Sequence, residues 1–207
     1  MDLRLTHLWQ PARATSQHLV VVLHGLGDSA AGFLWMQEEL GIDSLNYLLL
    51  NAPEPYYMGY SWYDIDDPLP GIKRSCRILT DVMQQIEQEG YPPDQTFLFG
   101  FSQGCLMTLE FGSRYPRSLA GYVGISGYCY SPEAILREMN AANNNGRWLV
   151  THGTRDELLP VEVTRAQIKS LKEGGFAIDY REYPKAHTID PGQEWRDIRE
   201  WFRNLLL

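Results

Sequence analysis

The segment 100–104 reads Gly-Phe-Ser-Gln-Gly and matches the pattern G-x-S-x-G. The serine of this pattern sits on a sharp turn from a strand into a helix, so that its hydroxyl projects into the open, and the two glycines relieve backbone crowding at the turn. The apolar run 96–99 before the motif predicts the strand, and the apolar segment after it predicts the helix. Ser102 is therefore predicted to be a nucleophile.

A serine hydroxyl becomes a good nucleophile only when a base takes up its proton, and this base is most often a histidine. Where the serine lies on such a strand-to-helix turn, the acid and then the histidine follow it along the chain. Of the five histidines, only His152 and His187 follow Ser102. His152 comes before the best candidate for the acid, whereas His187 lies on a loop after the last predicted strand. His187 is therefore predicted to be the base.

The third member of such a triad is an acid that holds the imidazole in the correct tautomer and stabilises the imidazolium. Asp156 fits this role, because it lies in a predicted turn between a strand and a helix. Its neighbour Glu157 is the alternative. Asp179 within a predicted strand and Asp190 at the start of a helix are less well placed.

Acyl transfer also needs two backbone N–H groups that hold the negative charge developing on the carbonyl oxygen. One is expected from Gln103, the residue after the serine. The other is expected from Leu26, in the loop 23–28 (Leu-His-Gly-Leu-Gly-Asp) that follows an early strand. His24 in the same loop is expected to make structural hydrogen bonds.

The elements that must position these residues alternate along the chain between apolar runs and helical patterns. Apolar runs without strict alternation are typical of parallel strands covered on both faces. Strands are predicted at 3–9, 18–23, 46–50, 96–99, 119–125, 147–150 and 176–183, and helices at 72–86, 103–115, 161–171 and 195–205.

This order predicts a compact α/β-hydrolase fold, with a mainly parallel central sheet and helices on both faces, formed by a single domain over residues 1–207. Chemistry in such sheets gathers at the carboxyl ends of the strands. Only residues 127–146 separate two predicted strands beyond the nucleophile helix, which leaves room for one helix and for no cap domain. The site is therefore expected to be shallow and open.

The long segment 52–71 is rich in aromatic residues and is expected to form one wall of the cleft, because loops of more than about 12–15 residues are usually functional or disordered. Trp62 in this segment and Leu158, two residues after Asp156, are the side chains expected to contact the substrate.

Composition, charge and cysteine content limit which partners the protein is expected to bind and where in the cell it is expected to lie. The net charge of −8 and the pI near 5.1 argue against nucleic acid and anionic membrane surfaces. No stretch approaches the roughly 18 apolar residues of a membrane span, and residues 1–4 do not resemble a secretory signal. The three cysteines, Cys76, Cys105 and Cys129, are sparse and odd in number, which predicts buried, reduced thiols in a cytoplasmic protein.

Three segments in this order, 23–28, 100–104 and 152–160, together resemble the phospholipase/carboxylesterase family, which includes the acyl-protein thioesterases. The segment 62–65 (Trp-Tyr-Asp-Ile) is similar to that family's tryptophan-aromatic-aspartate segment. The resemblance runs from about Val20 to the last predicted helix. It implies hydrolysis of carboxylic esters or thioesters without a metal or organic cofactor. Dimers are common in such proteins, so the resemblance also implies a homodimer.

The chain departs from the family pattern at four places. Cys105 stands where the family usually has a second glycine, and Lys185-Ala186 precede His187 where glycines are common. The segments 66–71 and 127–130, which belong to the acyl channel of the thioesterases, are shorter or different here. These last two departures favour short acyl chains over long ones.

The leading hypothesis is a serine carboxylesterase that hydrolyses short- to medium-chain esters of small molecules, or another acylated substrate, through an acyl-serine intermediate. The alternative is an acyl-protein thioesterase or lysophospholipase that acts on long chains. A peptidase of this fold usually carries a second domain. A non-enzymatic binding protein on this fold typically lacks the nucleophile or the base, whereas Ser102, Asp156 and His187 are all present in order.

Overall fold

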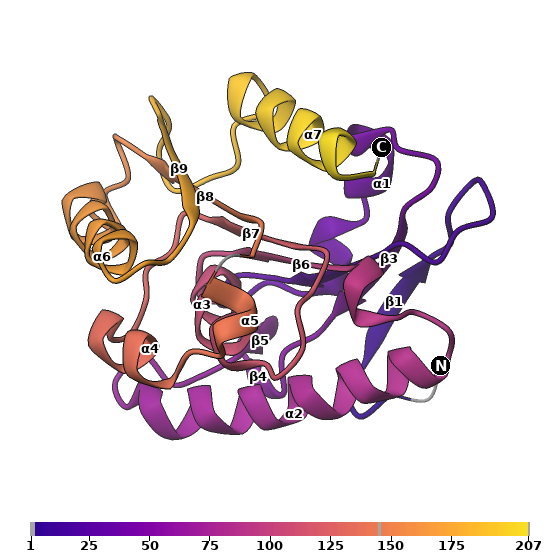
Figure 1. The fold of residues 1–207 in the computed structure, drawn as a ribbon, viewed down its shortest axis with the longest axis horizontal. Coiled ribbons are helices and arrows are strands. Elements are labelled where there is room, and N and C mark those ends of the chain that lie inside the picture. Colours follow the sequence, from indigo (N-terminus) through magenta and orange to yellow (C-terminus); the bar gives the residue numbers. More distant parts are fainter. Residues whose placement is uncertain (1–2, 145, 207) are drawn as a thin grey trace.

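A computed structural model of the chain describes residues 3–144 and 146–206. Its strands are β1 (His7–Gln10), β2 (Leu19–Leu23), β3 (Asn46–Leu50), β4 (Glu54–Tyr56), β5 (Gly59–Ser61), β6 (Thr96–Phe101), β7 (Gly121–Ile125), β8 (Trp148–Gly153) and β9 (Ile178–Tyr183). Within the described residues, seven of these strands form one sheet in the order β1-β3-β2-β6-β7-β8-β9 (Figure 1). β1 runs antiparallel to β3 and every other neighbouring pair is parallel, which confirms the mainly parallel sheet.

Helices cover both faces of this sheet, as predicted (Figure 1). They are η1 (Ala30–Phe33), α1 (Met36–Leu40), α2 (Pro68–Gln88), η2 (Pro93–Gln95), α3 (Gln103–Arg114), α4 (Pro132–Glu138), α5 (Ala141–Asn144), α6 (Val161–Glu173) and α7 (Gln193–Leu206). One hydrophobic cluster joins the sheet to α2, α3, α4 and α6, and a second joins its other face to η1, α1 and α7. None of the helices in the described part of the chain has the length and apolar character of a membrane span.

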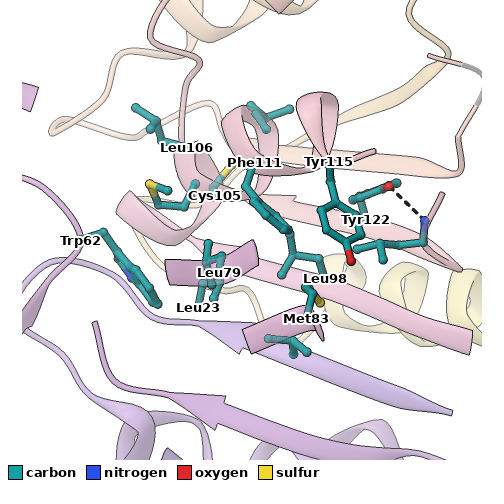
Figure 2. Close-up of a cluster of buried hydrophobic side chains, with 14 of the residues drawn as sticks. Leu23, Trp62, Leu79, Met83, Leu98, Cys105, Leu106, Phe111, Tyr115 and Tyr122 are labelled. Atoms are coloured by element: carbon teal, nitrogen blue, oxygen red, sulfur yellow. Dashed lines mark hydrogen bonds between the residues drawn. The ribbon is translucent and has the colours of Figure 1, made fainter. Parts of the chain in front are cut away.

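β2 shows why the central strands are apolar at every position. Leu19, Val21 and Leu23 pack in the cluster of α2 and α3, whereas Val20 and Val22 pack in the cluster of α1 and α7. All five side chains are at most 1% exposed, because successive side chains point to opposite faces and both faces are covered. Figure 2 shows part of the first cluster, where Leu23 and Leu98 of the sheet lie beside Leu79 and Met83 of α2.

Several predicted strand boundaries differ from the structure by one or more residues, because pairing, rather than local composition, decides where a strand ends. β6 continues two residues past the predicted end, since Gly100 and Phe101 pair with Gly124 and Ile125 of β7. β8 continues to Gly153 through pairs with β9. β1 covers His7–Gln10 rather than 3–9, because its pairing with β3 runs only from His7 opposite Leu50 to Gln10 opposite Tyr47.

The segment 52–71 is more regular than predicted. β4 and β5 pair as an antiparallel hairpin, and Tyr57 at its turn adopts a positive φ of 50°. The predicted helix 72–86 is confirmed, but α2 already begins at Pro68, where a missing N–H costs no helical hydrogen bond. Between β7 and β8 the described residues form two short helices, α4 and α5, where one was expected.

The approach of α3 to the sheet depends on the small size of Gly104. A Cβ at this position would overlap the carbonyl oxygen of Leu23 at the end of β2, and it would lie 2.9 Å from the carbonyl oxygen of His24. Both carbonyl oxygens belong to the backbone, so neither can move aside by a change of side-chain rotamer.

Gly104→Ala should therefore lower the free energy of unfolding by about 2–3 kcal/mol, because α3 must move off the sheet. Gly41→Ala is the matched control: Gly41 has a φ of 57° but no atom within 3.7 Å of an added Cβ. It should cost about 1 kcal/mol from backbone strain alone. Urea denaturation measures both values, and equal losses in the two variants would contradict the close contact.

Candidate active site

Ser102 occupies a strained turn at the carboxyl end of β6. Its φ of 55° and ψ of −115° are unusual for a residue with a side chain. Backbone hydrogen bonds hold this conformation: the Ser102 N–H donates to the Ile125 carbonyl oxygen at 2.9 Å, and its own carbonyl oxygen accepts from the N–H groups of Cys105 and Leu106. The turn leads directly into α3, in agreement with the predicted strand-turn-helix context of the motif.

Ser102, His187 and Asp156 lie in one chain of hydrogen bonds, although they are far apart in the sequence. Ser102 Oγ is 2.9 Å from His187 Nε2, and His187 Nδ1 is 2.7 Å from Asp156 Oδ2. The carboxylate can only accept, so the proton belongs on Nδ1, and Nε2 is left to accept from the serine hydroxyl. The parallel sheet brings them together, because all three follow the carboxyl ends of β6, β8 and β9.

Asp156 is held by more than the histidine. Its Oδ1 accepts from the backbone N–H groups of Leu158 at 3.1 Å and Leu159 at 2.9 Å. Burial acts to raise the pKa of this carboxyl, but the bonds from Leu159 and His187 outweigh it and leave the pKa below its usual value. The group therefore stays ionised at neutral pH.

The alternative acids lie in other surroundings. Glu157 is exposed, Asp179 pairs with Arg181, and the Asp190 carboxylate accepts from the Glu194 N–H. Of the candidates weighed from the sequence, Asp156 is the carboxylate that contacts His187.

His152 supports the Asp156 turn, a role that the sequence did not indicate. It is fully buried, and its Nε2 lies 2.8 Å from the Leu159 carbonyl oxygen and 3.5 Å from Asp156 Oδ2. Burial lowers the pKa of His152, so the imidazole is neutral and its Nε2–H donates to Leu159.

The loop 24–28 lies against the serine. A Cβ on Gly25 would be 3.2 Å from the Cβ of Ser102. The loop is fixed by the buried His24, whose Nδ1 lies 2.6 Å from the Gly25 carbonyl oxygen and whose Nε2 accepts from the Ala52 N–H at 3.0 Å. The N–H groups of Leu26 and Gln103 donate to no other residue in the described part of the chain.

Trp62 does not contact the cleft, so the prediction that its side chain contacts the substrate is wrong. Its side chain is 0% exposed and lies in the hydrophobic cluster of Figure 2. A buried indole N–H requires an acceptor, and it finds the His24 carbonyl oxygen at 2.9 Å, beneath the loop 24–28. Leu158, the other predicted substrate contact, is 73% exposed beside Asp156.

The Gln103 side chain connects the nucleophile turn to the segment 52–71. Its Oε1 accepts from the Trp62 N–H at 2.9 Å, and its Nε2 donates to the Tyr63 carbonyl oxygen at 2.8 Å. The sequence pointed only to the Gln103 backbone N–H, and it gave no signal for this second function of the residue.

A buried ion pair lies behind His187. The Lys185 ammonium donates to Glu194 Oε1 at 2.7 Å, to Ser126 Oγ at 2.9 Å and to the Thr188 carbonyl oxygen at 2.6 Å. All three of its N–H groups therefore have acceptors. Because Lys185 and Thr188 lie on either side of His187 in the chain, these contacts fix the loop that carries the imidazole.

Two cavities are lined by residues of the candidate site, one by Leu26 and the other by Phe101 and His187. The first, of about 420 Å³, is bordered by the segment 52–71, and the second, of about 490 Å³, is bordered by His187. The first is lined by Leu26, Glu54, Pro55, Tyr56, Ser61, Tyr63, Asp64, Ile65, Asp67, Pro70, Gly71 and Arg74. The second is lined by Asp28, Gly32, Phe33, Trp35, Glu39, Phe101, His187, Thr188, Ile189, Pro191 and Trp195.

The side chain of Cys105 fills space left by two glycines, one in β7 and one just after it. Cys105 is fully buried, and a Cβ on either Gly124 or Gly127 would lie less than 3.0 Å from its sulfur. Burial raises the pKa of the thiol to about 12, so it is protonated at neutral pH.

Among the described residues, no group of three or more His, Cys, Asp or Glu side chains could hold a metal ion.

Comparison with protein families finds that residues 9–206 match the phospholipase/carboxylesterase family. Acyl-protein thioesterase 1 of Yarrowia lipolytica is 29% identical over 92% of this chain and 93% of its own length. Carboxylesterase SOBER1 of Arabidopsis thaliana is 27% identical over 90% of each chain.

Solved structures share the fold. The crystal structure of esterase PE8 superposes with a TM-score of 0.83 at 25% identity and covers 98% of this chain and 100% of its own. The crystal structure of Arabidopsis thaliana SOBER1 superposes with a TM-score of 0.85 at 24% identity, over 93% of this chain and 100% of its own.

Lys185→Met should lower the free energy of unfolding by about 3–5 kcal/mol, because Glu194 would remain buried without its cation. Lys169→Met is the matched control: its 3.7 Å contact with Glu173 joins two exposed side chains. It should change stability by less than about 0.5 kcal/mol. Chemical denaturation at pH 7 measures both, and a loss for Lys185→Met no greater than the control would show that the buried pair contributes little.

Proposed function

This chain belongs to the phospholipase/carboxylesterase family and is a carboxylic ester hydrolase, and we propose that it is a serine carboxylesterase for short- to medium-chain esters. The observation that carries the proposal is the chain of hydrogen bonds from Ser102 through His187 to Asp156. It supplies a nucleophile, a base that reaches its proton and a carboxylate that orients the base.

In the proposed mechanism, Ser102 Oγ attacks the substrate carbonyl carbon while His187 Nε2 accepts the serine proton. Asp156 keeps the other imidazole proton on Nδ1 and stabilises the imidazolium. The Leu26 and Gln103 N–H groups donate to the oxyanion. His187 then gives its proton to the departing alcohol, and water activated by His187 releases the acid from the acyl-serine.

The preference for short or medium acyl chains is supported by the cavity that Leu26 lines. Besides Tyr56 and Tyr63, it is lined by Glu54, Asp64, Asp67 and Arg74. A long alkyl chain placed there would remove water from these charged groups, which is costly. We include Leu158 in the proposed substrate contacts, because its side chain is exposed beside Asp156.

The second candidate is a thioesterase or lysophospholipase for long acyl chains. It is favoured by curated relatives in several fungi that are named acyl-protein thioesterase 1, including those of Yarrowia lipolytica and Schizosaccharomyces pombe. The single domain, the cytoplasmic location and the homodimer remain predictions from the sequence.

Hydrolysis of p-nitrophenyl esters from about two to sixteen carbons, with Ser102→Ala measured in parallel, tests the proposal. We expect kcat/KM to peak at short chains, and we expect Ser102→Ala to lower kcat by about 10⁴-fold or more because the nucleophile is lost. The urea midpoint of the variant should stay close to that of the wild type.

A peak at long chains would favour the thioesterase or lysophospholipase. Equal turnover by folded Ser102→Ala would exclude Ser102 as the nucleophile, and no hydrolysis at any length would favour a binding protein on this fold.

A further inference from the structure

The cavity that His187 lines, here called the aromatic cavity, has a rigid apolar wall. Trp35 is 38% exposed, and its ring centroid lies 4.9 Å from that of Trp195 and 6.0 Å from that of Phe33. The Trp35 indole N–H donates to the Gly32 carbonyl oxygen at 2.7 Å, which fixes the orientation of the ring. An apolar surface that is already ordered binds a ligand without a further loss of side-chain freedom.

The aromatic cavity reaches His187, the proposed base. Phe101, the residue before the serine, packs on the His187 ring with centroids 5.2 Å apart, and both residues line the cavity. His187 Nε2 faces Ser102 Oγ at 2.9 Å. A group seated between Phe101 and Trp35 would therefore extend from a substrate atom that lies beside His187.

The proposed mechanism decides which part of an ester occupies this position. The atom that takes the proton from His187 is the oxygen of the departing alcohol. The carbonyl oxygen must instead point toward the Leu26 N–H, and Leu26 lines the other cavity. The alcohol portion of the ester consequently extends into the aromatic cavity, and the acyl portion extends away from it.

The charges around the aromatic cavity restrict the alcohol further. Asp28 and Glu39 are its acidic lining residues, and no Lys or Arg lines it. Within the described residues neither carboxylate belongs to an ion pair; the Arg199 guanidinium contacts Glu39 at its backbone carbonyl oxygen and not at its carboxylate. An anionic alcohol would be repelled by both groups, whereas a neutral or cationic one would not.

We propose that the aromatic cavity is the binding site for the alcohol portion of the substrate, and that it selects esters of aromatic or bulky apolar alcohols that are neutral or cationic. This inference rests on the proposed esterase function and adds to it the class of alcohol that is released. Trp35 provides the main contact surface, and Glu39 provides the discrimination against negative charge.

Four acetates test the proposal, because they share the acyl group and differ in the alcohol: ethyl, benzyl, 4-carboxybenzyl and 4-(trimethylammonio)benzyl acetate. In the wild type we expect kcat/KM for benzyl acetate to exceed that for ethyl acetate by roughly tenfold, from burial of the ring. The carboxybenzyl ester should be slower than the benzyl ester by about fivefold, and the cationic ester should be at least as fast as the benzyl ester.

Two variants, each with a neighbouring control, assign these effects to residues. Trp35→Ala should lower the benzyl to ethyl ratio by about fivefold or more, whereas Leu34→Ala should leave the ratio unchanged, since Leu34 is exposed but does not line the cavity. Glu39→Gln should raise the carboxybenzyl to benzyl ratio by about twofold to threefold. Glu38→Gln, one residue earlier and outside the cavity, should not.

Wild-type enzyme that hydrolyses ethyl acetate and benzyl acetate at equal rates would overturn the alcohol site and leave the esterase function standing. An unchanged ratio in folded Trp35→Ala would do the same. Absence of hydrolysis of all four acetates and of the p-nitrophenyl esters would overturn the esterase function, and the alcohol site with it.

Discussion

The close contact of the first turn of α3 with the carboxyl ends of β2 and β6 sets the geometry of the whole site. Two glycines permit it: a Cβ on Gly100 would meet the Gly104 carbonyl oxygen, and a Cβ on Gly104 would meet the carbonyl oxygens of Leu23 and His24. Because α3 begins immediately after Ser102, this contact brings the serine and the Gln103 N–H beside the loop 24–28. The parallel sheet then places the turns after β8 and β9 at the same edge.

Buried polar residues beneath the candidate site stabilise the positions of its loops through hydrogen bonds. His24 fixes the loop 24–28, the Gln103 side chain ties the nucleophile turn to Trp62 and Tyr63, and Lys185 ties the His187 loop to α7. Each of these groups is hydrogen-bonded, as burial in a medium of low dielectric requires. Hydrogen-bonded supports of this kind pre-organise the side chains that meet at the surface.

Much of the fold and the residues of the candidate triad could be predicted from the sequence, because both depend on local patterns. Apolar runs marked the central strands, and the motif around Ser102, followed by Asp156 and His187 in order, marked three strand ends. The supporting contacts could not be predicted, because their partners are distant in sequence. Lys185 would be expected in solvent unless its pairing with Glu194 were known, and aromatic composition alone could not show that Trp62 points into the core. Trp35 lies outside the aromatic segment 52–71, and no local pattern predicted that it would line a cavity together with His187.

Because Cys105 packs against Gly124 of β7 and Gly127 just after it, the side chains at these three positions share one volume between α3 and the end of β7. A larger side chain at position 124 or 127 requires a smaller residue at position 105. A glycine at position 105 would leave a cavity that a larger residue at 124 or 127 has to fill. Substitutions at these positions are therefore non-additive: two exchanges that each fail alone can succeed when made together. A combinatorial library that varies the helix and the strand at the same time would reach sequences that stepwise mutagenesis of this enzyme would discard.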